Sequence, residues 1–209
     1  MEDLLIIGGS MSEYRKKNEK TMNQLTTTVL KMLETQSLNS LTISAVCREA
    51  KLNRGTFYLH YHDLPDLIQS CEDEFFTDLN HDRTKLLKNN HTVSTYLTHD
   101  EQVVRMLLNV VSQHQKLLKV MLGHNGDSQF KERFHAQLVE MALSGFKEIS
   151  PLPKAQQILL ANYNAGAIMG MITNWVQEPR LNQEELLHLI NQLNHHSFLE
   201  VVTNLKETV

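Results

Sequence analysis

The chain has 209 residues, of which 41% are hydrophobic and 21% charged, and it contains only 4 Pro and 8 Gly. This composition is typical of a globular protein rich in helix, and the length allows one large domain or two small ones. The net charge of −4 excludes a chain that is basic throughout. No apolar run approaches the roughly 18 residues that a membrane span needs.

The charge is unevenly distributed along the chain. Residues 11–63 carry 8 Lys and Arg against 5 Asp and Glu, whereas residues 64–209 carry 12 against 17. A mildly basic front on an acidic body is typical of a small nucleic-acid-binding domain joined to a larger module that does not bind nucleic acid. Solvated surface charge distributed by chance would give the same pattern, so the asymmetry is supporting evidence only.

The first ten residues are acidic and too short for a signal peptide. Met11 follows Gly8-Gly9-Ser10, and we therefore expect residues 1–10 to be an upstream or non-native extension that takes no part in the fold. The two cysteines, Cys47 and Cys71, lie in apolar helical patterns. We expect both to be reduced core residues without a disulfide.

Three helices are predicted before residue 63. Apolar residues at three- and four-residue spacing predict a helix over 18–36, followed by a turn at 37–40. Thr42 is a suitable N-cap for a short helix over 43–49, and Asn53 for another over 54–60. Asp63, with Pro65 and Asp66 after it, predicts the start of a long helix that continues to about residue 88.

The rest of the chain is also predicted to be helical. Residues 89–98 are polar and indicate a loop. Further helices are expected over 100–113, 115–122, 128–149, 154–177 and 182–206, with breaks at Gly and Pro residues. The sequence therefore predicts an all-α protein of about nine helices without strands.

Residues 41–63 carry the clearest functional signal. They form two helices too short to be stable alone, joined by a three-residue turn, with Ile43, Val46, Leu52 and Phe57 available to hold them together. This is the pattern of a helix-turn-helix, whose second helix enters the major groove with its N-terminal part, while capped helix ends and hydroxyls hold phosphates.

The same segment resembles the TetR/AcrR family of transcriptional regulators. Thr42, Glu49-Ala50, Asn53, Gly55-Thr56-Phe57-Tyr58 and Tyr61 match the family's N-terminal pattern, and the resemblance covers about residues 18–70. It implies a three-helix DNA-binding domain over 11–63 and a helical regulatory and dimerisation domain over 64–209. It also implies a bacterial, cytoplasmic protein that is not an enzyme.

The resemblance implies a role for each matching residue. Thr42, Asn53 and Tyr58 would contact phosphates, and Tyr61 would pack or add a hydroxyl. Arg54, Thr56 and His60 would face base edges, Arg preferring guanine. Gly55 would let the backbone approach the DNA. Surface exposure explains His60 and His62 as well as a DNA contact does.

Two positions depart from the family pattern. Lys51 stands where the turn residue is usually Gly, so the turn either holds Lys in a left-handed conformation at some cost or takes a tighter shape. Leu64 stands where the family often places a phosphate-binding Lys. One positive contact is therefore missing, and Lys51, expected at the DNA face, is a candidate to replace it.

In this family the last two long helices pair with their copies in a second subunit. Residues 154–177 contain the small residues Ala161, Ala165, Gly166, Ala167 and Gly170, which allow close helix approach. A dimer would present two DNA-binding domains to half-sites about one helical turn apart. The alternative is that these faces form only the core of a monomer.

A small-molecule effector is a further expectation. Residues 102–122, 163–166 and 172–176 resemble regulators related to the dihydroxyacetone-kinase operon activator. A Met-rich, adaptable pocket would suit an apolar ligand, although a Met-rich core explains the methionines equally. The candidate pocket residues are Met106, His114, Met121, Phe134, Tyr163, Met169, Asn174 and Trp175.

No cofactor or metal ion is expected. The sequence has no Gly-rich phosphate loop, no nucleophile elbow and no zinc-protease motif, and its eleven His residues are scattered. The leading hypothesis is a ligand-responsive repressor that binds a palindromic operator as a homodimer. The alternative is a TetR-like coactivator or adaptor whose body binds a protein partner, and the missing Lys at Leu64 keeps it open.

Overall fold

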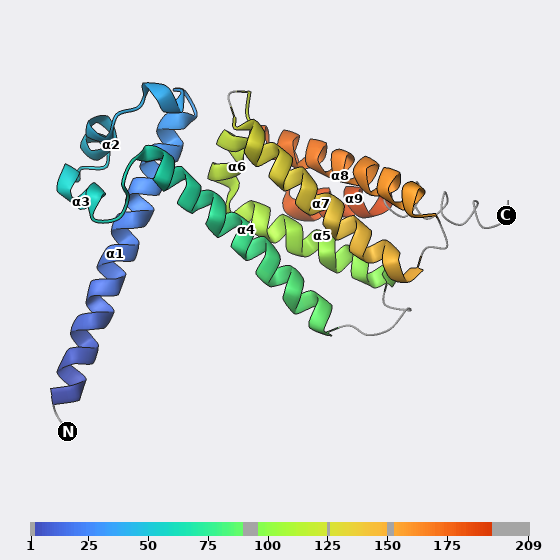
Figure 1. Ribbon diagram of the computed structural model, residues 1–209, viewed down its shortest axis with the longest axis horizontal. Coiled ribbons are helices and arrows are strands. Elements are labelled where there is room, and N and C mark those ends of the chain that lie inside the picture. The colour runs from blue at the N-terminus through green and yellow to red at the C-terminus, as the bar shows by residue number, and fades with distance from the viewer. Residues whose placement is uncertain (1–2, 90–95, 125, 150–152, 194–209) are drawn as a thin grey trace. The chain divides into compact units, whose positions relative to one another are not determined.

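The computed structural model describes residues 3–89, 96–124, 126–149 and 153–193. Within these residues the regular elements are all helices (Figure 1), which confirms the predicted all-α class. The elements are α1 (Asp3–Leu33), the short 3-10 helix η1 (Leu38–Ser40), α2 (Ile43–Glu49), α3 (Arg54–Tyr58), α4 (Leu64–Asn89), α5 (Tyr96–Gln113), α6 (Gln115–Met121), α7 (Ser128–Ile149), α8 (Lys154–Gln177) and α9 (Gln183–Leu193).

Most helix boundaries agree with the prediction, because caps, Gly and Pro mark them locally. α2, α7 and α8 have the predicted bounds, and α3 ends two residues early. The first helix differs: α1 begins at Asp3, so residues 3–10 are helical although the sequence analysis left them out of the fold. The predicted continuation of the last helix over 194–206 lies outside the described residues.

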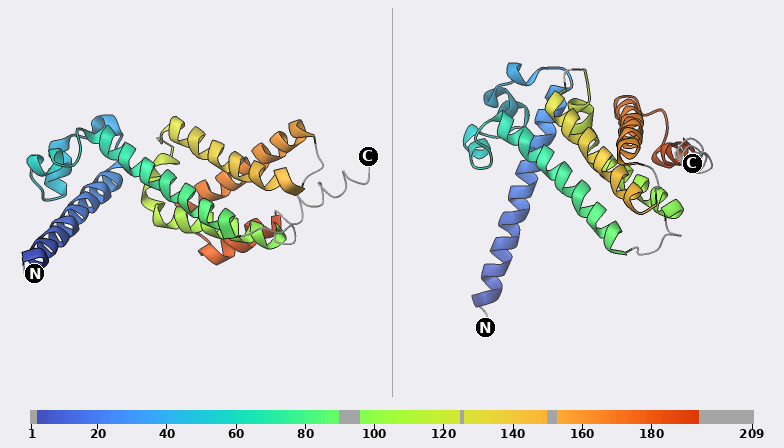
Figure 2. Two further views of the ribbon diagram at one scale, coloured as in Figure 1. Left: turned by 60° about the horizontal axis from the view of Figure 1, so that its bottom comes forward. Right: turned by 45° about the vertical axis from the view of Figure 1, so that its right-hand side comes forward.

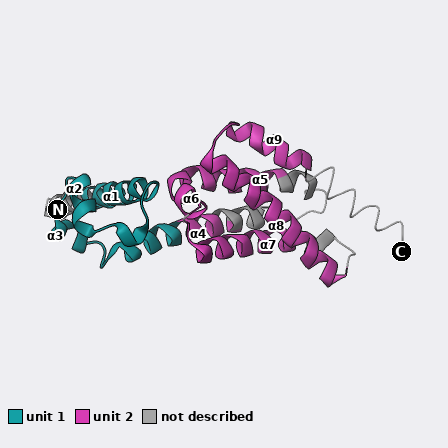
Figure 3. Cartoon of the chain, turned by 90° about the horizontal axis from the view of Figure 1, so that it is seen from above, with its two compact units in different colours: residues 1–74 teal, residues 75–209 magenta. Residues whose placement is uncertain are grey.

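The chain divides into two compact units, residues 1–74 and 75–209 (Figure 3). The division falls inside α4, whereas the sequence analysis placed the domain boundary at residue 63, directly before this helix. The first turns of α4 therefore belong to the first unit. The predicted functional domains over 11–63 and 64–209 stay a prediction.

The first unit is held by one small apolar core. Leu25 and Val29 of α1, Val46 of α2, Phe57 of α3 and Leu67 of α4 are fully buried. α2 packs against both α1 and α3, and Figure 2 shows the two short helices to one side of the long α1. The core thus fixes α3 through a single side chain, Phe57, and leaves the rest of this five-residue helix near the surface.

The second unit is built around packed helices with an aromatic centre. α7 and α8 run alongside each other, and α5 packs against α9. Phe75 stands edge-on to Phe134 with ring centroids 5.3 Å apart, and Phe130 lies 5.7 Å from Phe75. These rings are fully buried and form the apolar interior that holds α4 against α7.

Both cysteines are free and buried, as predicted. None of the helices in the described parts of the chain has an apolar stretch that would cross a lipid bilayer.

Candidate nucleic-acid interface

The first helix of the predicted helix-turn-helix is capped by Thr42. Its backbone is extended, and its hydroxyl oxygen accepts a hydrogen bond from the N–H of Ala45 at 3.2 Å. Thr42 is exposed, so its hydroxyl proton remains available for a second acceptor. At the other end of α2, the carbonyl of Ala50 accepts a hydrogen bond from the side-chain amide of Gln24 in α1.

The turn after α2 contains the departure noted at Lys51. Lys51 has φ of 54°, the only positive φ of a non-Gly residue in the described part of the chain. Its N–H donates to the carbonyl of Arg48 (3.2 Å), and the N–H of Leu52 donates to the carbonyl of Cys47 (2.9 Å). These two bonds close the helix in the way that normally favours glycine at this position. Of the two expected alternatives, the structure has the left-handed lysine, and the side chain of Lys51 is exposed.

Asn53 fixes the start of α3. Its Oδ1 accepts hydrogen bonds from the backbone N–H of Thr56 (2.7 Å) and from the Thr56 hydroxyl (3.0 Å). The amide nitrogen of the same side chain still has donors to offer, and the residue is exposed. The hydroxyl proton of Thr56 is directed to the cap, which leaves its oxygen and methyl group for an outside contact.

After α3, Asp63 caps the start of α4. The N–H of Asp66 donates to Asp63 Oδ1, and the N–H of His62 donates to Asp66 Oδ2, both at 2.8 Å. These two bonds stand at the predicted start of α4 and resemble a capping box, with His62 in place of the cap residue as the second donor. Leu64 is buried, so the position where the family often has a phosphate-binding Lys belongs here to the core.

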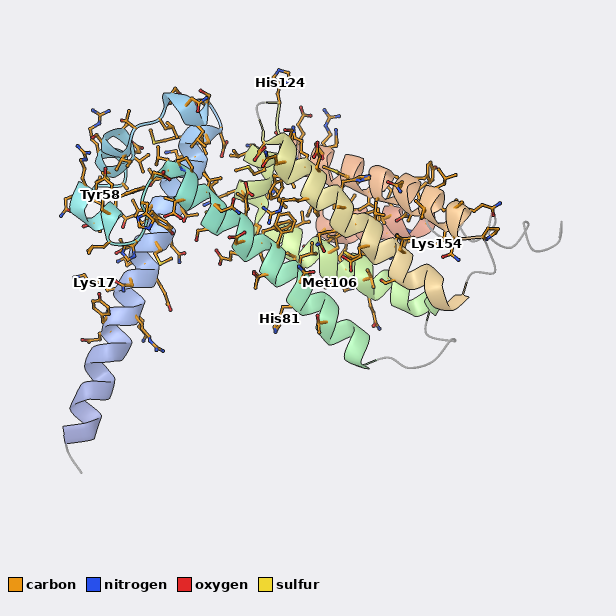
Figure 4. All side chains as sticks on the ribbon, in the orientation of Figure 1. Lys17, Tyr58, His81, Met106, His124 and Lys154 are labelled. Atoms are coloured by element: carbon orange, nitrogen blue, oxygen red, sulfur yellow. The ribbon has the colours of Figure 1, made fainter. Side chains whose placement is uncertain are left out.

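Arg54 and Tyr58 lie one helical turn apart on the surface of α3, where Figure 4 labels Tyr58. The guanidinium of Arg54 donates to the Tyr58 hydroxyl at 3.4 Å, and its carbon lies 6.0 Å from the ring centroid. The hydrogen bond from Arg54 to Tyr58 raises the pKa of Arg54 above its already high value, so the guanidinium stays charged. Tyr58 is half exposed, at 51%.

The remaining predicted DNA-contacting residues differ in exposure. Gly55 and His62 are exposed and His60 is half-buried. Tyr61 is 6% exposed, and burial raises the pKa of its hydroxyl, an effect that the neighbouring side chains of Thr26 and Ser70 partly offset. Of the two roles considered for Tyr61, packing is therefore the one its position serves.

One side chain on this surface was missed by the sequence analysis. Leu59, directly after α3, is 81% exposed. The sequence contains a signal for this exposure. Leu59 is two positions after Phe57, and residues two positions apart lie on nearly opposite faces of a helix.

The eight candidate pocket residues lie in different surroundings. Met106, Met121 and Phe134 are buried, and Figure 4 labels Met106 within the second unit. His114 Nε2 is 2.9 Å from Asp78 Oδ2, and its ring stands edge-on to Phe75 at 5.6 Å. Tyr163 is 68% exposed.

Three others line two open hollows on the surface that share lining residues. Met169 and Asn174 line one along α8, and Asn174 and Trp175 line the other, of about 420 Å³, between α8 and α9. Trp175 is largely buried and donates from Nε1 to the carbonyl of Leu181 at 2.8 Å. The described residues bring no three His, Cys, Asp or Glu side chains together in a way that would hold a metal ion.

Residues 98–196 match the family described as "Transcriptional regulator C-terminal region" of the TetR type. The chain is also 22% identical over 181 residues to the uncharacterized HTH-type transcriptional regulator YxbF of Bacillus subtilis (strain 168). That alignment covers 83% of this chain and 46% of YxbF, so the chain spans about half the length of this curated relative.

Solved structures share the fold. A TetR-family transcriptional regulator from Syntrophomonas wolfei superposes with a TM-score of 0.66 at 15% identity, covering 85% of this chain and 94% of the other. The dihydroxyacetone kinase operon activator DhaS superposes with a TM-score of 0.54 at 16% identity, covering 88% of this chain and 96% of DhaS. At these identities the superpositions establish the arrangement of the helices.

Proposed function

We propose that this chain is a TetR-type transcriptional regulator without enzymatic activity, a ligand-responsive repressor that binds a palindromic DNA operator as a homodimer in the bacterial cytoplasm. The match of residues 98–196 to the C-terminal region of TetR-type regulators and the shared fold support this proposal. Residues 11–63 would hold the DNA, and residues 64–209 would form the dimer and bind the effector.

The observation that carries the DNA-binding proposal is the pair of caps around the turn between α2 and α3. Thr42 and Asn53 each cap a short helix and remain exposed. Between and after them, Lys51, Arg54 and Tyr58 offer two cations and a hydroxyl on the same short stretch of chain. Cations and hydroxyls of this kind hold phosphates, and Arg also pairs with guanine in the major groove. This arrangement supports double-stranded DNA as the partner.

The exposed apolar residues of α8 and α9 support the homodimer. Leu159 and Tyr163 on α8 are 71% and 68% exposed, and Leu189 and Leu193 on α9 are at least 40% exposed. A Cβ built on Gly166 or Gly170 would meet nothing within 4 Å. The fold of one protomer therefore does not require glycine at these positions, whereas close approach of a second α8 would.

A polar pair at the edge of the aromatic interior supports an effector site in the body. The hydrogen bond between His114 and Asp78 lies beside Phe75, and Met106, Met121 and Phe134 are buried in the same unit. Pockets for small molecules combine an apolar lining with a few such polar groups. An effector that inserts here would displace the helices next to α4 and weaken DNA binding.

A second candidate function is a coactivator or adaptor whose body binds a protein partner. It is favoured by the buried Leu64, which removes a phosphate contact common in the family, and by the name of the structurally similar DhaS, an operon activator. A stoichiometric protein partner recovered with the purified chain, together with DNA affinity too weak to enrich a sequence, would favour this function over the repressor.

The test of the repressor proposal is selection of duplexes from a random library with the purified full chain. We expect enrichment of a palindrome and a log–log dependence of affinity on salt with a slope of about −0.9 for each phosphate contacted. Arg54→Ala and Tyr58→Phe should both weaken binding to the selected duplex. Unchanged binding by both variants would contradict these contacts, and enrichment of no duplex would contradict DNA binding itself.

A further inference from the structure

Leu59 is the most exposed large apolar side chain that the structure describes, at 81%. It is the C-cap of α3 and keeps helical backbone angles, with φ of −71° and ψ of −21°. Its N–H donates to the carbonyl of Gly55 at 3.1 Å. The side chain is therefore held outward by a regular helical turn.

The position of Leu59 on α3 follows from Phe57. Successive residues on a helix are rotated by about 100°, so Leu59 and Gly55 both lie nearly opposite Phe57. Phe57 is fully buried in the core of the first unit. Leu59 consequently lies on the outer side of α3, at the C-terminal end of the helix, and Gly55 leaves the surface one turn earlier without a side chain.

The side chains on either side of Leu59 are polar. Arg54 and Tyr58 lie on one flank, joined by their 3.4 Å hydrogen bond, and Thr56 lies on the other, tied to the Asn53 cap. A single exposed leucine is ordinary on a protein surface. Here, however, Leu59 lies on the side of α3 that points away from the core, in line with Gly55.

The major groove of DNA offers one apolar group at base edges, the C5-methyl of thymine. We propose that Leu59 packs on a thymine methyl in each operator half-site and so specifies T at that position. Gly55 would allow the approach, because no Cβ stands between the α3 backbone and the bases. This proposal rests on the proposed DNA-binding function and adds to it a contact that excludes cytosine, which lacks the methyl group.

The experiment uses the full chain and a palindromic duplex selected from a random library. Each thymine of the half-site is replaced in turn by deoxyuridine, which removes the methyl and keeps the base pairing. We expect one or two replacements to weaken wild-type binding about fourfold for each methyl lost. Leu59→Ala should bind the thymine duplex more weakly and lose its sensitivity to deoxyuridine at those positions only, whereas Leu59→Met should keep most of it.

Two results would overturn the proposal. One is that, at every thymine of the selected duplex, replacement by deoxyuridine weakens binding by Leu59→Ala as much as it weakens binding by the wild type. The other is weaker binding by Leu59→Ala that is equal on thymine and deoxyuridine duplexes, which would indicate a contact with the DNA backbone. Enrichment of no duplex would instead contradict the proposed function. Since Leu59 is exposed, its replacement should leave the unfolding curve unchanged, which separates a lost contact from a lost fold.

Discussion

The side-chain oxygen of Asn53 accepts two hydrogen bonds from Thr56, one from the backbone N–H at 2.7 Å and one from the hydroxyl at 3.0 Å. The residue that starts α3 therefore also fixes the side chain of the third residue of the helix. A helix of five residues has little stability of its own. The geometry of the proposed DNA-binding face thus depends on this one side chain and on the buried Phe57.

Replacing Asn53 separates capping from DNA binding. Asn53→Ala should lower the free energy of unfolding by about 1 kcal/mol, because the N–H of Thr56 loses its acceptor. Asn53→Asp should keep the cap and the stability. It should still weaken binding to a selected duplex, because it places a negative charge beside phosphates. Chemical unfolding and fluorescence anisotropy measure the two effects. Equal DNA affinity of wild type and Asn53→Asp would exclude a phosphate near this position.

Replacing Lys51 separates backbone strain from DNA binding. Lys51→Gly should raise the free energy of unfolding by about 0.5–1 kcal/mol, because glycine adopts a φ of 54° without the strain of a side chain. Lys51→Ala, the matched control, keeps the Cβ and should leave stability nearly unchanged.

Both Lys51 variants lose the charge, and both should reduce the salt slope of DNA binding by about 0.9 for each contact removed. Duplex titrations at several salt concentrations measure it. Salt slopes equal to that of the wild type would show that Lys51 does not replace the phosphate contact that is missing at Leu64.

The proposed dimer can be tested at Gly170. Gly170→Leu fills the open space beside α8 and should prevent a second α8 from approaching, so we expect a monomer in analytical ultracentrifugation with a helical circular dichroism spectrum. Loss of the linked second half-site should weaken operator binding about a hundredfold.

A control for this variant is Ala136→Leu, which places the same side chain at an exposed position on α7. It should remain dimeric and bind the operator normally. A dimeric Gly170→Leu protein would show that subunits pair through another surface.

Cys71 should make a pH-dependent contribution to the free energy of unfolding. Burial raises the pKa of its thiol from the ordinary value of 9.0 to about 11. The folded-state pKa lies above the unfolded one, so the stabilisation is complete below about pH 9 and is lost as the pH rises through 11.

Between about pH 9 and 11, the unfolding free energy of the wild type should fall more steeply than that of Cys71→Ala, by up to about 1.4 kcal/mol per pH unit. Urea unfolding at several pH values measures the two slopes. Parallel slopes would show that the thiol titrates normally. Slow reaction of the native protein with a thiol reagent at pH 8, and fast reaction in urea, should accompany the steeper slope.

The local elements of the first unit could be predicted because their causes are local. Thr42, Asn53 and Asp63 accept hydrogen bonds from N–H groups three residues ahead, so the residues that start each helix are adjacent in the sequence. The spacing of apolar residues likewise identified Phe57 and Val46 as core, and both are fully buried.

The sequence by itself therefore determined the helices, their caps and the residue types on α3, since each depends on neighbours within one helical turn. The tertiary structure decided what depends on distant chain segments. It placed Tyr61 and Leu64 in the core and left Leu59 outside it, and it paired His114 with Asp78. Burial and side-chain pairing of this kind are set by packing between helices, and no single stretch of sequence contains that information.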